Sequence, residues 1–278
     1  RPADPLAPGR FGGTFPPMQL TLALGALTAL AVLHASAAIV EKPVDYRDGD
    51  TVLEGVLYYD DAVTTPRPGV LVVPEWWGLH PFVKAQARRV AELGYVAFAC
   101  DMYGAGKVTD DPKVAGEFAG PFRSDLALTL RRARAGLAQL AAAPGVDAQR
   151  LSAIGFCFGG TVVLNLARAG EPLRLVGSFH GSLKTDAPAA PGVVKAHVLV
   201  LHGGSDPMVP PADVAAFMGE MIAARADWRL DTYGTALHAF TNPRARELNK
   251  VLPAVDYDPA AEAASFATLH AALVERNR

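Results

Sequence analysis

Short apolar runs rich in β-forming residues alternate with helical patterns from Asp50 to the end of the chain, and this alternation restricts the possible folds strongly. The predicted strands are residues 53–59, 70–73, 95–99, 151–155, 175–179, 198–202 and 228–233. The predicted helices are residues 81–93, 124–142, 158–169, 211–224 and 258–276. Several strands are continuous runs of Val, Leu and Ile, as expected for strands buried on both faces. The pattern predicts a single α/β domain with a mostly parallel central sheet and helices on both faces.

The first 37 residues do not share this alternation. Residues 1–17 are rich in Pro and Gly, and we treat them as a leader outside the folded domain. Residues 20–33 carry no charge, and Ala35-Ser36-Ala37 has the small-x-small form of a signal-peptidase site. The sequence therefore predicts a signal peptide over residues 18–37 and a domain over residues 38–278 that is secreted or periplasmic.

Two alternatives for the N-terminal segment stay open. Residues 18–21 carry no Lys or Arg, although a signal peptide usually begins with positive charge. A retained membrane anchor is one alternative, but an anchor needs about 20 apolar residues and this run is shorter. An ordinary N-terminal helix is the other. With cleavage, we expect no stable membrane anchor in the mature protein.

The charge balance and the cysteine count exclude several classes of protein. The chain has 26 Lys and Arg against 28 Asp and Glu, for a formal net charge of -2, and no basic cluster. This argues against nucleic acid as the main partner. Cys100 and Cys157 are too few for a disulfide-stapled scaffold or a four-cysteine zinc site. Function is therefore expected from a local site, and in parallel sheets such sites form at the carboxyl ends of the strands.

A candidate nucleophile follows the strand at residues 151–155. The segment Gly155-Phe156-Cys157-Phe158-Gly159-Gly160 runs directly into a helical pattern. It has the form of a nucleophile elbow, in which small flanking residues permit a strained turn that exposes the central side chain. The N-terminus of the following helix favours the thiolate form of Cys157. The alternative is an inert, buried cysteine at a tight packing turn, since free cysteines are mostly small core residues.

Two later strand ends supply partners for this thiol. Asp206 follows the strand at residues 198–202, and His238 follows the strand at residues 228–233. The order nucleophile, acid, histidine is the order used on α/β-hydrolase sheets. His238 would take the proton, and Asp206 would orient the imidazole. His180 and His202 also stand at strand ends and are rivals for the base, but neither follows the acid.

Glu75 lies in the loop after the strand at residues 70–73, followed by Trp76 and Trp77. In this kind of fold that loop supplies one backbone N–H of the oxyanion hole, and the residue after the nucleophile supplies the other. We therefore expect Trp76 and Phe158 to be the donors. A carboxylate near Cys157 raises the cost of forming the thiolate, so Glu75 would keep the thiol protonated in the empty site. The alternative for Glu75 is an ordinary surface salt bridge.

Taken together, these segments resemble the dienelactone hydrolase family, also called carboxymethylenebutenolidases. The resemblance covers about residues 50–275 and rests on VPEWWGL (73–79), AELGYVA (91–97), DMYG (101–104), GFCFGG (155–160), HGGSDPMVP (202–210) and HAFTNP (238–243). It implies a single-domain α/β-hydrolase with a Cys-Asp-His triad and a glutamate that contacts the resting thiol. By position these are Cys157, Asp206, His238 and Glu75. It implies no metal or organic cofactor.

The sequence departs from the family where dienelactone itself would bind. Members that open dienelactone hold its carboxylate with two arginines, one shortly after the D-x-Y segment and one four residues beyond the catalytic histidine. Here the first region reads Gly104-Ala105-Gly106-Lys107 and the second position is Asn242. We expect Tyr103, Lys107 and Trp77 to contact substrate, although Lys107 lacks the bidentate fork of arginine. The expected substrate is a small lactone or ester whose identity the sequence does not give, and whether dienelactone is accepted stays open. We expect the enzyme to be a monomer.

Two other functions compete with this hydrolase. An exported thiol redox protein using Cys100 and Cys157 is one, but the chain has no Cys-x-x-Cys motif. An inactive binding protein on the same fold is the other. The sequence favours a hydrolase that forms an acyl-thioester on Cys157.

Overall fold

The three-dimensional structure is a computed structural model, and it describes residues 38–278. The predicted leader and signal peptide lie outside these residues. None of the described helices is long and apolar enough to cross a membrane.

In the described part of the chain, eight strands form one sheet in the order β1-β2-β4-β3-β5-β6-β7-β8. The strands are β1 (Ile39–Asp48), β2 (Thr51–Asp60), β3 (Arg67–Val73), β4 (Val96–Ala99), β5 (Val146–Phe156), β6 (Leu175–Phe179), β7 (His197–Gly203) and β8 (Trp228–Tyr233). The β1–β2 and β2–β4 pairs are antiparallel, and all the other neighbours are parallel. The carboxyl ends of β3 to β8 therefore lie along one edge of the sheet.

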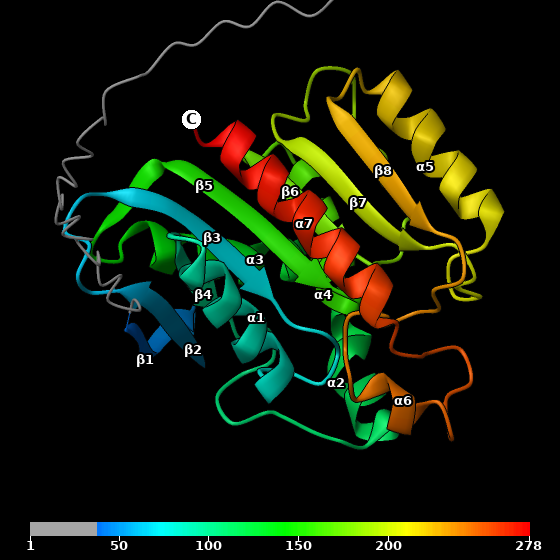
Figure 1. Cartoon of the computed structure of the whole chain (residues 1–278), viewed down its shortest axis with the longest axis horizontal. Coiled ribbons are helices and arrows are strands. Elements are labelled where there is room, and N and C mark those ends of the chain that lie inside the picture. The colour runs from blue at the N-terminus through cyan, green and yellow to red at the C-terminus, as the bar shows by residue number, and fades with distance from the viewer. Residues whose placement is uncertain (1–37) are drawn as a thin grey trace, which may run out of the picture. The chain divides into compact units, whose positions relative to one another are not determined.

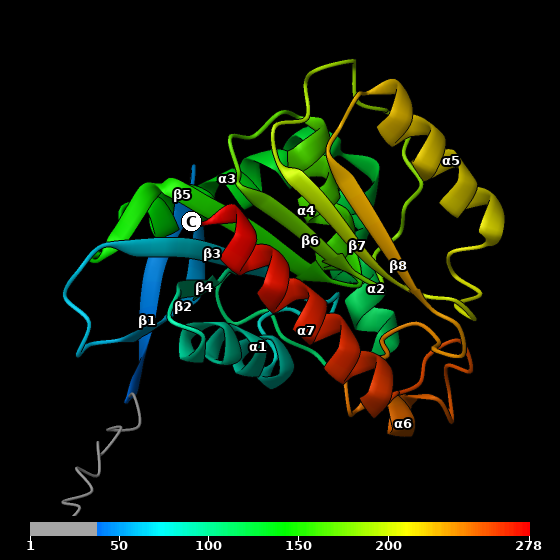
Figure 2. The ribbon, with the colours of Figure 1, turned by 45° about the horizontal axis from the view of Figure 1, so that its top comes forward.

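Helices cover both faces of the sheet (Figures 1 and 2). They are α1 (Pro81–Glu92), α2 (Pro112–Ser124), α3 (Leu126–Ala141), α4 (Phe158–Arg168), α5 (Pro211–Ala223), α6 (Ala245–Leu248) and α7 (Pro259–Arg276). One core cluster joins α1 and α7 to one face of the sheet and includes Val90 of α1, Leu269 of α7 and Val72 of β3. The other joins α3, α4 and α5 to the opposite face, where Leu71 and Val73 point. The predicted fold class is confirmed.

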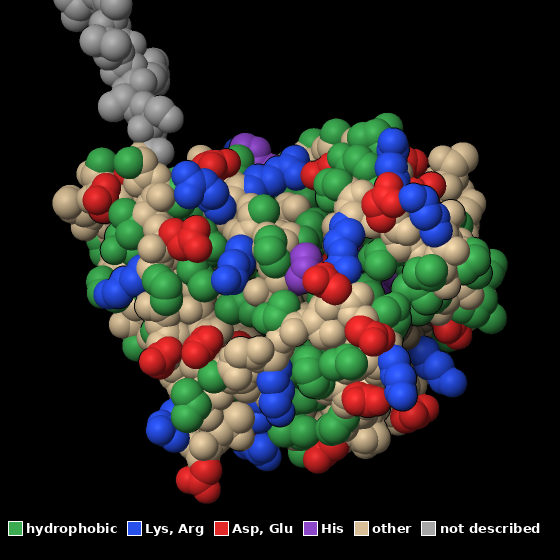
Figure 3. All heavy atoms as spheres, turned by 90° about the horizontal axis from the view of Figure 1, so that it is seen from below, with side chains coloured by type: hydrophobic (Ala, Val, Ile, Leu, Met, Phe, Trp, Pro, Cys, Tyr) green, Lys and Arg blue, Asp and Glu red, His purple; other side chains and the backbone are tan. Residues whose placement is uncertain are grey.

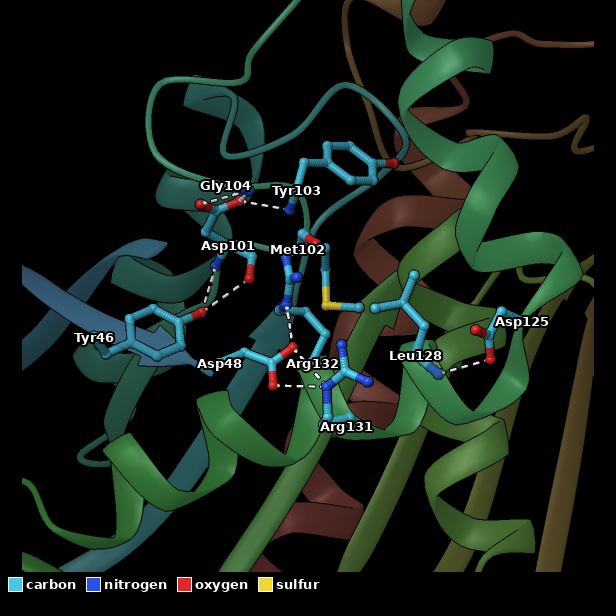
Figure 4. Close-up of polar contacts among 10 residues, drawn as sticks. All are labelled: Tyr46, Asp48, Asp101, Met102, Tyr103, Gly104, Asp125, Leu128, Arg131 and Arg132. Atoms are coloured by element: carbon cyan, nitrogen blue, oxygen red, sulfur yellow. Dashed lines mark hydrogen bonds and ion pairs between the residues drawn. The ribbon is translucent and has the colours of Figure 1, made fainter. Parts of the chain in front are cut away.

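Strand β1 has no counterpart among the predicted strands. Its sequence IVEKPVDYRD is mostly polar, because it is an edge strand with half of its residues exposed. Two of its side chains fix it to the molecule (Figure 4). The Tyr46 hydroxyl donates to the carbonyl of Asp101 at 2.9 Å and accepts from its N–H at 3.0 Å. Asp48 accepts from Arg131 at 2.8 Å and from Arg132 at 2.9 Å, which anchors α3 to the strand.

Helices α2 and α6 were also not predicted. Helix α2 contains two glycines and an internal proline, residues that usually indicate a loop. Its start is nevertheless well specified, because Asp111 caps it by accepting from the Lys113 N–H at 2.8 Å and Pro112 occupies the first turn. Helix α6 has four residues, which is too short for a periodic pattern.

Candidate active site

Cys157 stands at the junction of β5 and α4, in a strained backbone conformation. Its φ of 52° and ψ of -115° lie outside the regions that L-residues ordinarily occupy. The turn needs glycines on both sides. A Cβ on Gly155 would overlap the carbonyl oxygen of Gly159, and a Cβ on Gly159 would overlap that of Val73. The sequence therefore brings β3, the elbow and α4 into direct backbone contact, which leaves the half-buried Cys157 at the sheet edge.

The three residues of the predicted triad form one hydrogen-bonded chain. Nε2 of His238 lies 3.0 Å from Sγ of Cys157, and its Nδ1 lies 2.8 Å from Oδ2 of Asp206. An ionised carboxylate only accepts, so Nδ1–H donates to Asp206. The other oxygen of Asp206 accepts from the Met208 N–H at 2.8 Å, which fixes the carboxylate in its loop. Asp206 and His238 are both buried.

The surroundings of His238 favour its charged form. Burial disfavours the imidazolium, but the charge of Cys157 and the hydrogen bonds to Asp206 and Cys157 outweigh it and raise the pKa of His238 to about 10. A proton on His238 beside a thiolate is the arrangement that activates a cysteine nucleophile. The geometry can thus hold a thiolate–imidazolium pair.

Glu75 is buried, and it makes no ion pair within residues 38–278. Its Oε2 accepts from Nδ2 of Asn242 at 2.7 Å. Burial raises the pKa of Glu75 to about 7, against the opposing effects of the Asn242 bond and of the charges on His238 and Arg244. This environment contradicts the surface salt-bridge alternative. The structure also differs from the contact implied by the family resemblance, because Sγ of Cys157 is hydrogen-bonded to His238 rather than to Glu75.

The two predicted oxyanion donors lie on segments that meet at the elbow. The Phe158 N–H is the first of α4, and the first N–H groups of a helix have no partner within it. Trp76 belongs to a turn closed by a 3.4 Å bond from the Gly78 N–H to the Glu75 carbonyl. The carbonyl of Trp76 accepts from the Tyr103 hydroxyl at 3.3 Å, which holds this turn in place.

A cavity of about 180 Å³ opens beside the triad. Its lining includes Glu75, Cys157, His238 and Asn242. Most of its other walls are apolar: Trp76, Trp77, Met208, Ala239, Leu248, Leu252, Pro253, Ala254 and Val255. Arg123 also lines it, with its guanidinium carbon 5.5 Å from the Trp76 ring centre. The site is therefore an apolar pocket around the reactive sulfur.

Of the three residues predicted to contact substrate, one lines the cavity and two do not. Trp77 lines the cavity. Tyr103 does not; it is buried behind the wall, where its ring packs against Phe158 with centroids 5.8 Å apart. Lys107 lines a separate small hollow with Glu54 and Asp101, in a loop that has positive φ at Gly104 and Gly106. The expectation that Lys107 faces the same pocket as the triad is wrong.

Several residues of the site were not predicted from the sequence. The segment after α6 brackets His238: the His238 N–H donates to Ala254 at 3.2 Å, and the Asp256 N–H donates to the carbonyl of His238 at 3.1 Å. Arg123 reaches the cavity from the unpredicted helix α2. The segment at 248–255 carries no motif, and its mostly apolar composition after the HAFTNP segment is the only signal that could have indicated it.

The structure does not favour the redox alternative. Cys100 and Cys157 are both free thiols. Cys100 is completely buried, and burial raises its pKa well above the usual range. A thiol in that state is a poor partner for exchange. Within residues 38–278, no group of three His, Cys, Asp or Glu side chains is arranged to hold a metal ion.

The model of the dienelactone hydrolase family matches residues 53–274 of this chain. A solved metagenomic "Dienelactone Hydrolase-like Promiscuous Phospotriesterase" is 38% identical, with a TM-score of 0.78 over 85% of this chain and 98% of its own. A second structure, m3DLH, is also 38% identical, with a TM-score of 0.82 over 87% of this chain and 100% of its own. A protein of Escherichia coli (strain K12), provisionally described as a carboxymethylenebutenolidase, is 29% identical over 72% of each chain. The chain therefore belongs to the dienelactone hydrolase family and is a hydrolase of the α/β-hydrolase fold.

Proposed function

We propose that this enzyme hydrolyses a small lactone or carboxylic ester through an acyl-thioester on Cys157. The observation that carries the proposal is the continuous chain from Asp206 through His238 to Sγ of Cys157, which ends at the wall of an apolar cavity. A nucleophile, a base and a carboxylate that orients the base are the groups required for acyl transfer.

In this mechanism the Cys157 thiolate attacks the substrate carbonyl carbon, and the carbonyl π electrons move to oxygen. The N–H groups of Phe158 and Trp76 stabilise that oxyanion. The intermediate collapses to the acyl-thioester as His238 donates its proton to the departing alkoxide. Neutral His238 then deprotonates a water that attacks the thioester carbon. The thiolate leaves, and the carboxylic acid is released.

Glu75 fits a role in controlling the charge of the empty site. Its carboxyl group is buried with the triad around one cavity, so its ionised form opposes a second negative charge on Cys157. With a pKa of about 7, a substantial fraction of Glu75 is protonated near neutral pH. The ionised fraction of Glu75 rises as the pH increases through about 7, so the carboxylate would oppose the Cys157 thiolate more strongly at higher pH.

The cavity favours uncharged substrates. Its walls are mainly aromatic and aliphatic, and the polar side chains that line it are those of the proposed machinery, Asn242 and Arg123. Burying a charged group against such walls costs free energy unless it is paired. A neutral ester or lactone with an apolar acyl or alcohol group is therefore the proposed substrate class.

A neutral phosphotriester is a second candidate substrate. The metagenomic relative is named a promiscuous phosphotriesterase, and it shares 38% of its residues with this chain over nearly its whole length. An uncharged phosphorus centre would meet the same mainly apolar walls as an uncharged ester. A low phosphotriesterase activity beside a higher esterase activity is the expected pattern.

A hydrolysis screen of the purified protein tests these proposals. The substrates are lactones, short-chain p-nitrophenyl esters and one neutral phosphotriester, each assayed with Cys157→Ala as the matched control. We expect turnover of at least one ester or lactone that disappears in the control. Equal activity in Cys157→Ala would remove Cys157 as the nucleophile.

A further inference from the structure

His180 is a buried histidine beside the triad that the proposed mechanism does not use. It follows β6 directly and is 1% exposed. Its backbone φ is 40°, a left-handed conformation that is uncommon for a residue other than glycine. Its ring stands edge-on to that of His238, with centroids 5.3 Å apart. A buried imidazole held in a strained conformation this close to the base needs an explanation.

Two hydrogen bonds define the tautomer of His180. Its Nδ1 lies 3.1 Å from the backbone nitrogen of Cys157, whose N–H it shares with the Phe179 carbonyl at 3.0 Å. That N–H is a donor, so Nδ1 accepts and the ring proton is on Nε2. Nε2 lies 2.8 Å from Oγ1 of Thr241, to which it donates. Thr241 is completely buried.

These two bonds join the two loops that carry the reacting atoms. Cys157 is the turn residue of the elbow, and Thr241 follows His238 by three residues in its loop. Both loops are strained, since Cys157 has a φ of 52° and Ala239 a φ of 57°. Strained turns persist only where their surroundings hold them. The His180 ring connects one turn to the other, across the pair whose Sγ and Nε2 are 3.0 Å apart.

The connection requires a neutral imidazole. A second proton on His180 would be on Nδ1. Nδ1–H would then face the Cys157 N–H, and two donors cannot form a hydrogen bond with each other. The titratable side chain in ring contact with His180 is His238, and the other ring partners are Phe156 and Phe240. Burial, together with the charge of His238, lowers the pKa of His180 well below its usual value. His180 therefore keeps one tautomer while His238 gains and loses its proton.

We propose that His180 is a positioning residue that locks the nucleophile elbow to the histidine loop through Thr241 and so sets the Sγ–Nε2 contact. The inference rests on the proposed function, because it concerns the geometry of the same triad. Hydrogen bonds that hold reacting groups in register affect turnover more than substrate binding.

Separate variants test the two bonds. His180→Phe removes both. Thr241→Val removes the acceptor, while Thr241→Ser keeps it. We expect His180→Phe and Thr241→Val to lower kcat by about tenfold or more, with KM within about twofold. Thr241→Ser should restore most of kcat. Because both changes break one connection, the double variant should lose no more than the worse single variant.

The alkylation rate of Cys157 by iodoacetamide at neutral pH gives a readout that does not depend on substrate. It should fall in His180→Phe and Thr241→Val, because the imidazolium is no longer held against the sulfur. Ser265→Ala is the control: Ser265 is completely buried, its hydroxyl donates to the Glu262 carbonyl at 2.8 Å within α7, and neither residue lines the cavity. It should lower the melting temperature and leave both rates unchanged. Should His180→Phe fail to fold, the Thr241 pair makes the same comparison.

The proposal is overturned if folded Thr241→Val keeps kcat and the alkylation rate within about twofold of wild type, the change expected of a purely structural hydrogen bond. This outcome is distinct from a failure of the proposed function. Full activity in Cys157→Ala would refute the nucleophile whatever the His180 variants show. An inactive Cys157→Ala with normal Thr241→Val would refute the positioning role alone.

Discussion

At the scale of single residues, the site combines strain with buried charge. The backbone has positive φ at Cys157 and Ala239, which line the cavity, and at His180, whose ring contacts that of His238; each such residue costs roughly 1–3 kcal/mol. The motifs predicted Cys157, Asp206 and His238, because a nucleophile elbow and the ends of two strands can be recognised from the sequence. They did not predict the His180–Thr241 connection or the Asn242–Glu75 bond, because each joins residues distant in the chain and depends on side-chain direction.

The first prediction at this scale concerns the nucleophile atom. Cys157→Ser keeps the fold but should lose at least about 100-fold in kcat/KM, since a hydroxyl is a far weaker acid than a thiol. Steady-state kinetics on the best ester from the screen measures the loss. Retention within about tenfold, or 1.4 kcal/mol, would be incompatible with a thiolate mechanism.

A second prediction follows from the raised pKa of Glu75. Its folded-state pKa of about 7 exceeds the usual 4.5, so between these values the folded state binds more protons than the unfolded state. The free energy of unfolding therefore falls as pH rises through this window. Glu75→Gln resembles the protonated acid and removes this loss. It should match wild type near pH 4.5 and exceed it by about 3 kcal/mol near pH 8.

Urea denaturation of both proteins at the two pH values measures this difference. The comparison is between variants at each pH, so the titration of other groups cancels to first order. A stability difference that is the same at both pH values would show that Glu75 titrates normally in the folded protein.

At the scale of elements, the sheet and its helices were largely predictable, because buried parallel strands are continuous apolar runs. The seven predicted strands correspond to β2 to β8. The sequence did not predict the polar edge strand β1 or the helix α2, which contains Gly and Pro. In both, tertiary contacts outweigh the local propensity. Asp48 and Tyr46 fix β1 through partners more than 50 residues away, which no local pattern reveals.

Two glycine substitutions separate a required glycine from a tolerated one. Gly159→Ala places a Cβ into the carbonyl oxygen of Val73 and should destabilise the protein by several kcal/mol or prevent folding. Gly219→Ala is the matched control within α5, where a Cβ meets nothing within 4 Å. It should stabilise by roughly 0.5–1 kcal/mol. Thermal denaturation distinguishes the two, and equal effects would contradict the proposed packing of the elbow.

The ion pair between β1 and α3 gives another prediction. Asp48 and Arg132 are each 5% exposed in their side chains. Asp48→Ala leaves the guanidinium of Arg132 buried without its carboxylate and should cost about 3–5 kcal/mol. The midpoint of urea denaturation reports this loss. A cost below about 1 kcal/mol, the size expected of an exposed pair, would show that β1 is not held by this contact.

At the scale of the whole molecule, the surface charge bears on the kind of partner, and the predicted signal peptide bears on the cellular compartment. Acidic and basic side chains are interspersed on the face shown in Figure 3, and neither sign dominates it. This is consistent with a small-molecule substrate. Export remains a proposal, since the signal pattern over residues 18–37 lies outside the described residues. It predicts a mature protein that begins near Ala38.

Intact-mass measurement of the protein from a periplasmic fraction tests export. The expected mass corresponds to cleavage after Ala35, Ala37 or a neighbouring small residue. The same chain with Ala35 and Ala37 replaced by bulky residues is the control, and it should remain uncleaved. A mass that retains residues 20–33 would indicate an anchor.

The most direct test of the account is to capture the acyl group on Cys157. The protein is mixed with a p-nitrophenyl ester of a bulky acid, whose thioester is expected to hydrolyse slowly. It is then quenched in acid during turnover and mapped by peptide mass spectrometry. We predict that the peptide containing Cys157 gains the mass of the acyl group in step with release of p-nitrophenolate, and that Cys157→Ala releases none. Release at the wild-type rate from Cys157→Ala, with no acylated peptide in either protein, would contradict the account.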